Sequence, residues 1–87
     1  MKSFNSLWDE LALSKQSPRV GSRTSELLEL GVHAIGKKVV EEAAEVWMAA
    51  EHESSERTAE EISQLIYHLQ VLMTAKGIDI ADLEKNL

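Results

Sequence analysis

Cysteine is absent from this sequence of 87 residues, and proline occurs only once, at Pro18. Without cysteine, the chain has neither a disulfide framework nor a thiolate metal site. No apolar run approaches the roughly 18 residues that a membrane-spanning helix needs. The first segment carries Asp9 and Glu10 and lacks the unbroken apolar core of a signal peptide. We therefore expect a soluble, cytoplasmic protein that does not act in a membrane.

Positive charge is also scarce, and it is unevenly distributed along the chain. The formal net charge is -6. Residues 1–38 hold six Lys/Arg against four Asp/Glu, whereas residues 39–87 hold three against eleven. A surface that binds duplex nucleic acid carries a basic stripe, and this pattern contains none. The acidic half suits a metal cation, and the more basic N-terminal half suits the anion that such a metal carries.

The first third of the chain predicts a short helix followed by a loop. Ser3 is a suitable cap for that helix, because apolar residues follow it at helical spacing. The stretch 14–25, which surrounds Pro18, is dominated by turn and polar residues and predicts the loop. Gly31 is expected to divide a second short helix from a longer one.

The rest of the chain predicts a hairpin of two long helices, at about 32–52 and 56–76. Gly77 is a suitable residue to end the second one, and Asp79 a suitable cap for a short last helix. Strand-like alternation never persists, so we expect a single all-α domain over residues 1–87, with short terminal helices around a central antiparallel hairpin. Because one hairpin cannot bury both its apolar faces, we also expect a homodimeric helical bundle.

Acidic residues on the two long helices predict a cation site. Glu41, Glu42 and Glu45 lie within about one and a half turns, and on that helix alone they favour a charged face turned to water. Glu61 changes this reading, since it borders the apolar arc of the second helix, where a carboxylate is costly unless paired or coordinated. If the chain reverses between the helices, Glu42 and Glu45 meet Glu61 and Gln64 at about the same height. Four oxygen ligands on facing helices suit Mg²⁺.

Two acidic strings carry a resemblance to a known family. "EEAAE" (41–45) followed by "EISQ" (61–64) resembles the EExxE…ExxD motif of the all-α, MazG-like nucleoside triphosphate pyrophosphatases. Within that group, residues 22–87 are similar to the phosphoribosyl-ATP pyrophosphohydrolase family. The string EExxE alone is common in helices, but the ordered set of matching residues is specific. The matching residues are Ser22, Thr24, Leu27, Gly31, Lys37, Lys38, Glu41, Glu42, Glu45, Glu60, Glu61, Tyr67 and His68.

The resemblance implies Mg²⁺-dependent hydrolysis of phosphoribosyl-ATP to phosphoribosyl-AMP and pyrophosphate, in the second step of histidine biosynthesis. The implied catalytic carboxylates are Glu41, Glu42, Glu45 and Glu61. The implied metal ligands are Glu42, Glu45, Glu61 and Gln64. Cationic and hydroxyl side chains are expected to meet the substrate phosphates: Lys37, Lys38, Arg19, Arg23, Ser22 and Thr24. One departure is that Gln64 stands where the family has an aspartate, so it contributes no full charge.

Other interpretations of the same residues stay open. The protein is alternatively a MazG-like house-cleaning pyrophosphatase for another nucleoside triphosphate, or a non-catalytic helical dimerisation module whose acids are only solvated. Lys37 and Lys38 are equally suited to pairing with Glu41 and Glu42 on their own helix. For His68 a structural hydrogen bond is favoured over a role in the site.

Overall fold

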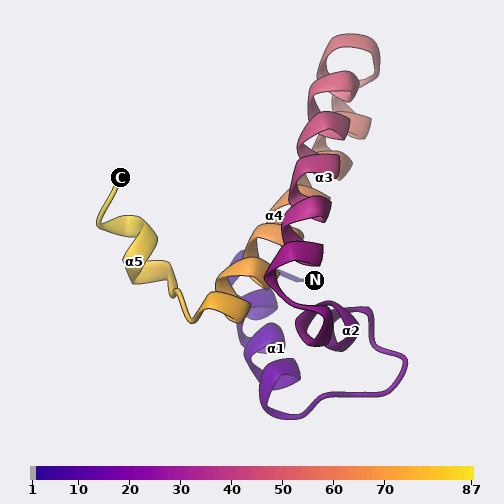
Figure 1. The fold of residues 1–87 in the computed structure, drawn as a ribbon. Helices are drawn as coiled ribbons and strands as arrows, with labels where there is room; N and C mark the ends of the chain where they lie inside the picture. Colours follow the sequence, from indigo (N-terminus) through magenta and orange to yellow (C-terminus); the bar gives the residue numbers. More distant parts are fainter. Residues whose placement is uncertain (1) are drawn as a thin grey trace.

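Figure 1 shows the computed structural model, which describes residues 2–87 and contains five α-helices. Their bounds are α1 (Phe4–Gln16), α2 (Arg23–Leu30), α3 (Val32–His52), α4 (Ser55–Lys76) and α5 (Ile80–Glu84). No strand is present in the described range, which confirms the expectation of an all-α fold. None of the helices within residues 2–87 is long and apolar enough to cross a membrane.

The central feature is the hairpin formed by α3 and α4, which pack against each other along their length (Figure 1). Its turn is short, because Ser54 caps α4 directly after α3 ends, and its side chain accepts a hydrogen bond from the backbone N–H of Arg57 at 3.1 Å. At the other end Gly77 stops α4 in the left-handed conformation, with φ 69°. The predicted bounds of both long helices are therefore confirmed to within about one residue.

The loop predicted over residues 14–25 is shorter in the structure, because α1 continues to Gln16 and α2 already begins at Arg23. The polar residues that suggested a loop are used as caps instead. The Ser22 side chain accepts a hydrogen bond from the backbone N–H of Ser25 at 3.2 Å. The buried hydroxyl of Ser25 in turn accepts one from the backbone N–H of Arg19 at 2.9 Å. The serine of this segment at position 22 therefore marks the start of a helix, in keeping with the preference of serine for N-cap positions.

The buried core lies at the base of the hairpin, where α1 packs against α2 and α4, and α2 packs against both long helices. It is small, so each of its members contributes a large share of the stabilisation. Half-buried apolar residues from α1, α2 and α4 surround it. Its buried members are Leu11, Leu27, Ile35 and Val71.

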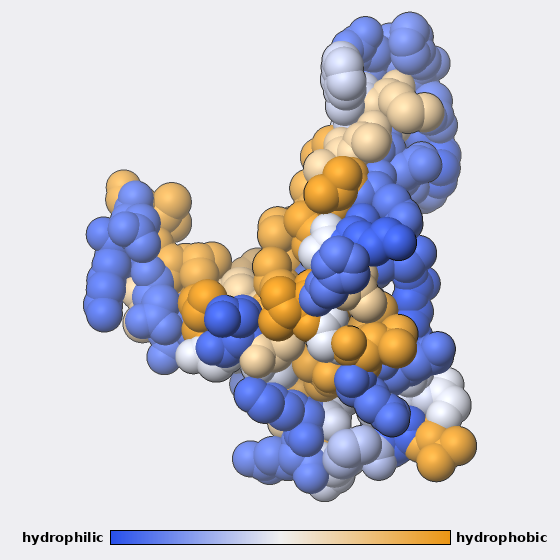
Figure 2. Space-filling model, in the orientation of Figure 1, coloured by the Kyte–Doolittle hydropathy of each residue, from blue (hydrophilic) through white to orange (hydrophobic). Residues whose placement is uncertain are grey.

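Beyond this base, the hairpin carries apolar side chains that no other helix covers. Figure 2 shows apolar residues gathered along the middle of the hairpin, with polar residues at its tip. On α3, Val32, Val40 and Trp47 recur at intervals of eight and seven residues, about two turns, which places them in a stripe along one side of the helix. The terminal helices cover less than expected: α5 has no buried residue and stands away from the hairpin in Figure 1. The large exposed apolar residues of the hairpin are Val32, Val40, Trp47, Met48, Ile62 and Leu69.

Candidate active site

Glu61 occupies a packing position in the seam between the two long helices. The residues of α4 that face α3 recur at intervals of three and four, and every one of them is buried or half-buried. The side chain of Glu61 is only 13% exposed. The sequence-based prediction that Glu61 borders the apolar arc is therefore confirmed. The residues of this seam on α4 are Thr58, Glu61, Leu65, His68, Leu72 and Ala75.

Glu42 occupies the corresponding kind of position on α3. It is half-buried, in step with Ile35, Val39, Val46 and Ala49, which are buried or half-buried on the same side of the helix. By contrast, Glu41 and Glu45 are exposed, and so is Gln64 on α4. Of the four predicted metal ligands, Glu42 and Glu61 therefore lie in the seam between the helices. Glu45 and Gln64 lie at the surface.

Arg57 is the charged partner of Glu61. The guanidinium Nη2 of Arg57 lies 3.5 Å from Oε1 of Glu61, one turn further along α4. The same side chain lies 3.3 Å from Glu53 and also pairs with Glu60. These hydrogen bonds, first that to Glu60 and then that to Glu53, raise the pKa of Arg57 above its ordinary value. Arg57 therefore stays charged and offsets part of the acidic cluster around it.

Sequence reasoning missed Arg57, although a local signal was present. Arg57 and Glu61 are four residues apart, which is the spacing at which opposite charges meet on one helix face. Glu53 precedes Arg57 by the same interval, just before α4 begins. The cost of a carboxylate at a packing position is thus met in the structure by an arginine of the same helix.

The donor chemistry of the predicted ligand set fits a hard cation, since every one of its members offers oxygen. The positions of these side chains do not form a complete binding site for such a cation. Within residues 2–87, no group of three or more acidic or histidine side chains is arranged to hold a metal ion. Mg²⁺ is often bound by only one or two carboxylates, with water and substrate phosphates as its other ligands. The seam carboxylates Glu42 and Glu61 meet that smaller requirement in number and type.

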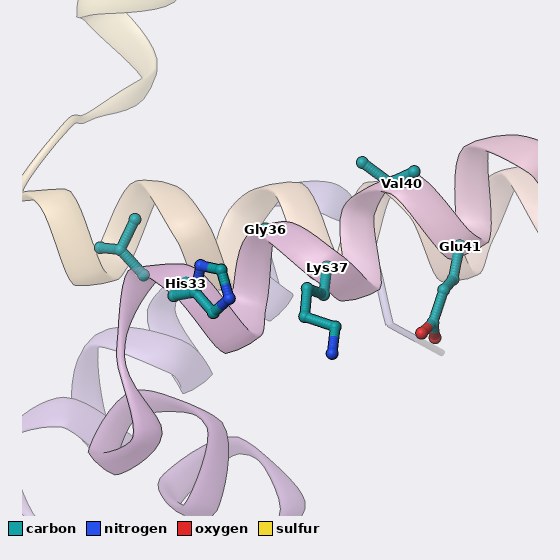
Figure 3. Close-up of a pocket in the computed structure, with 6 residues that line it drawn as sticks. His33, Gly36, Lys37, Val40 and Glu41 are labelled. Carbon is teal, nitrogen blue, oxygen red and sulfur yellow. The ribbon is translucent and has the colours of Figure 1, made fainter.

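The two lysines of α3 have different environments. Lys38 is half-buried, and its Nζ lies 3.3 Å from the carboxylate of Glu41, three residues further along α3. A lysine of this pair therefore does bind an acid of its own helix, but at a spacing of three residues instead of the predicted four. Lys37 is exposed and lines an open hollow of about 590 Å³ on the side of α3. Figure 3 shows that Lys37 and Glu41 both extend from this part of the helix. The other residues lining the hollow are Val32, His33, Gly36 and Val40.

The residues predicted at the N-terminus of α2 are tied into the fold. Ser22 is the cap of α2, and the hydroxyl of Thr24 is hydrogen-bonded to that of Tyr67. Arg23 is exposed, and its Nη2 lies 3.3 Å from Nε2 of His68. Arg19 is exposed in the loop before α2. The structure therefore gives Ser22 and Thr24 intramolecular partners and brings Arg23 to α4.

His68 is fully buried in the seam, where its Nδ1 lies 2.7 Å from the backbone carbonyl oxygen of Gln64. The favoured interpretation of His68 as a structural hydrogen-bonding residue is therefore confirmed. The bond to Arg23 across 45 residues of sequence was not predicted. It depends on where α2 packs against α4, and no local pattern contains that information.

Comparisons with known proteins bear on this site. The model of the phosphoribosyl-ATP pyrophosphohydrolase family matches residues 4–87. The chain is 55% identical over 87 residues to the phosphoribosyl-ATP pyrophosphatase of Bifidobacterium adolescentis, with 100% of each chain covered. It is also 55% identical over 87 residues to the phosphoribosyl-ATP pyrophosphatase of Bifidobacterium animalis subsp. lactis, again with 100% of each chain covered.

Together with the helical hairpin, these matches first define a class, namely all-α hydrolases that act on the pyrophosphate bond of a nucleotide. Within that class, the chain belongs to the phosphoribosyl-ATP pyrophosphohydrolase family. The resemblance inferred from the ordered motifs is therefore confirmed, together with the predicted class of reaction. The alternative of a non-catalytic helical module is set aside.

Proposed function

We propose that this protein hydrolyses phosphoribosyl-ATP to phosphoribosyl-AMP and pyrophosphate, as the second step of histidine biosynthesis, and that it does so with Mg²⁺. Membership of the family supports the reaction. The main structural support for the proposed site is the position of two carboxylates. Glu42 and Glu61 occupy packing positions in the seam between α3 and α4. Carboxylates at such positions cost stability unless they are paired, which is typical of residues kept for function.

Glu42, Glu45 and Glu61 are the proposed metal ligands, with Gln64 as a neutral oxygen donor beside them. Glu61 and Gln64 are three residues apart on α4, and Glu42 and Glu45 are three apart on α3, so each pair shares one helix face. Mg²⁺, when bound, would neutralise charge on the phosphate oxygens of the substrate. Its positive charge would also take over the role that Arg57 has beside Glu61.

The cations at the base of the hairpin are the proposed phosphate ligands. Lys37, Arg19 and Arg23 are exposed, and each is able to donate charge-assisted hydrogen bonds to phosphate oxygens. Lys38 is paired with Glu41, so it would have to exchange that partner for a phosphate. Substrate contact by Ser22 and Thr24 stays a prediction. Their bonds within the protein support a different role, in which they fix the backbone on either side of Arg23 and so hold Arg23 in place.

The chemical step requires a proton acceptor for the attacking water. The water oxygen bonds to phosphorus, the bond to the bridging oxygen between the α- and β-phosphates breaks, and pyrophosphate leaves with the electron pair. A carboxylate that is not spent on metal accepts the proton of the water. Glu41 lies outside the proposed ligand set, and its carboxylate becomes available when Lys38 exchanges it for a phosphate. We therefore assign the proton to Glu41, the carboxylate of this cluster on α3 that is not spent on metal.

We also propose that the protein acts as a homodimer. The exposed residues Val32, Val40 and Trp47 form a stripe along α3, which is 21 residues and thus about 30 Å long. A stripe of this length is large for a monomer to leave in water. The lack of packing around α5 supports the same conclusion, because a second copy offers that helix a surface to contact.

The function is tested by measuring pyrophosphate release from phosphoribosyl-ATP and from a panel of ordinary and modified nucleoside triphosphates, each with and without Mg²⁺. We expect release from phosphoribosyl-ATP with a kcat/KM at least about 100-fold above that of any other member, and only when Mg²⁺ is present. A preference for another triphosphate would favour a house-cleaning pyrophosphatase instead. Undiminished release after chelation of Mg²⁺ would contradict the metal assignment.

A further inference from the structure

Two consecutive residues of α2 are bonded to two consecutive residues of α4. Thr24 bonds to Tyr67 through their hydroxyl groups, and Arg23 bonds to His68 through Nη2 and Nε2 at 3.3 Å. The rings of Tyr67 and His68 are themselves in edge-to-face contact, with centroids 4.9 Å apart. The N-terminal turn of α2 is thereby fixed to α4 next to Gln64, at the end of the proposed metal-binding face.

The chemistry of the Arg23–His68 contact determines which atoms donate. Arginine has only donors, so Nε2 of His68 must be the acceptor. The proton of the neutral imidazole then lies on Nδ1, from which it is donated to the carbonyl oxygen of Gln64 at 2.7 Å. Because one bond fixes the tautomer that the other needs, Gln64, His68 and Arg23 form a directed chain.

Burial divides this chain into an anchor and an exposed end. His68 is 0% exposed, whereas Arg23 belongs to the exposed residues. A surface arginine normally samples many rotamers and loses that freedom when it binds an anion. An acceptor fixed in the helix seam restricts Arg23 beforehand and leaves the rest of its five N–H donors for a phosphate.

We propose that His68 is a positioning residue, which holds the guanidinium of Arg23 ready for the phosphates of phosphoribosyl-ATP. This inference rests on the proposed function, because it names a residue that prepares the substrate-binding cation of the same site. His68 itself touches no substrate in this arrangement and acts through Arg23. Its effect therefore falls on substrate binding and appears in KM more than in kcat.

Two near-isosteric substitutions separate the bonds of His68. In His68→Asn, the amide nitrogen replaces Nδ1 and keeps the bond to Gln64, but no atom reaches Arg23. In His68→Gln, the amide oxygen replaces Nε2 and still accepts from Arg23. Each is made alone and together with Arg23→Ala, and KM and kcat for phosphoribosyl-ATP are measured beside the melting temperature.

We expect Arg23→Ala and His68→Asn each to raise KM on the order of tenfold, as for the loss of one oriented charge-assisted bond. His68→Gln should keep KM within about twofold of the unsubstituted protein, and His68→Asn should raise KM little further once Arg23 is alanine.

The inference would be overturned if His68→Asn raised KM equally with and without Arg23. It would also be overturned if neither Arg23→Ala nor His68→Asn alone raised KM. If His68→Asn does not fold, the KM of His68→Gln tests the inference instead. A KM of His68→Gln as high as that of Arg23→Ala would overturn the inference. A failure of the proposed function is distinct, because the unsubstituted protein would then release no pyrophosphate from phosphoribosyl-ATP.

Discussion

The guanidinium of Arg57 lies 3.5 Å from the carboxylate of Glu61, one turn apart on α4. Arg57 is half exposed, whereas the Glu61 side chain is 13% exposed, so the buried acid is paired with a cation from the surface. A pair of this kind is easily exchanged, because water solvates the arginine when it leaves. Arg57 thus satisfies Glu61 without closing it to a competing cation.

Replacing Arg57 by alanine should strengthen the binding of Mg²⁺. The change removes a positive charge from the neighbourhood of Glu53, Glu60 and Glu61, so a divalent ion meets more uncompensated negative charge. We expect the Kd for Mg²⁺, measured by titration calorimetry without substrate, to fall on the order of two- to fivefold. The matched control is Lys85→Ala, which removes a lysine paired with Asp82 beside α5 and should leave the Kd unchanged. A weaker binding of Mg²⁺ by Arg57→Ala would contradict the competition between the two cations.

Replacing Gln64 by aspartate should also strengthen the binding of Mg²⁺. Gln64 is exposed, so a carboxylate at this position is solvated and costs little stability. It adds a full charge one turn from Glu61, on the face proposed to hold the ion. We expect the Mg²⁺ concentration for half-maximal pyrophosphate release to fall on the order of threefold or more. The control Gln16→Asp, at the end of α1, should leave it unchanged, and an unchanged value in Gln64→Asp would place Gln64 outside the metal site.

A charge in the exposed apolar stripe of α3 should break the proposed dimer. Val40 is 70% exposed in the single chain, so Val40→Glu introduces no buried charge there and leaves the monomer folded. In a dimer, the same glutamate would be desolvated, at a cost of several kcal/mol. Sedimentation equilibrium should therefore give a dimer for the unsubstituted protein and a monomer for Val40→Glu. Leu13→Glu, at a similarly exposed position on α1, should stay dimeric. A monomeric unsubstituted protein at micromolar concentration would refute the proposal.

The core at the base of the hairpin should account for a large share of the stability. Ile35 is fully buried among helices α2, α3 and α4, so Ile35→Ala removes apolar contacts and leaves a cavity. We expect the free energy of unfolding, measured with urea, to fall by about 2–5 kcal/mol. The control Val20→Ala changes a residue that is fully exposed in the loop and should alter it by less than about 0.5 kcal/mol. A loss below about 1 kcal/mol for Ile35→Ala would mean that this base is not the main core.

The sequence predicted those features that depend on neighbouring residues. Ser3 and Asp79 cap the helices that their positions indicated, because capping bonds reach only three residues along the chain. The seam position of Glu61 followed from helical spacing in the same way. Such local signals were therefore enough to predict the hairpin and the placement of Glu61 within it.

Of the features that were missed, the pair of Arg57 with Glu61 was local, whereas others depend on how distant segments meet. The bond between Arg23 and His68 spans 45 residues and exists only because α2 packs on α4. The bond of Thr24 to Tyr67 depends on the same packing of α2 on α4. The cap formed by Ser22 is local, but a hydroxyl that caps a helix is identical in sequence to one that binds a phosphate. The overestimated loop had a related cause, because serine is favoured both in turns and at helix starts.

The most direct test compares pyrophosphate release from phosphoribosyl-ATP by the unsubstituted protein with that by Glu42→Gln and Glu61→Gln. Both substitutions keep the shape of the side chain and remove its charge, so the melting temperature should hold or rise while kcat/KM falls on the order of 100-fold or more. The control Glu84→Gln, on the exposed helix α5, should retain full activity. Full Mg²⁺-dependent release by Glu42→Gln and Glu61→Gln would contradict the assignment of the active site to the seam carboxylates.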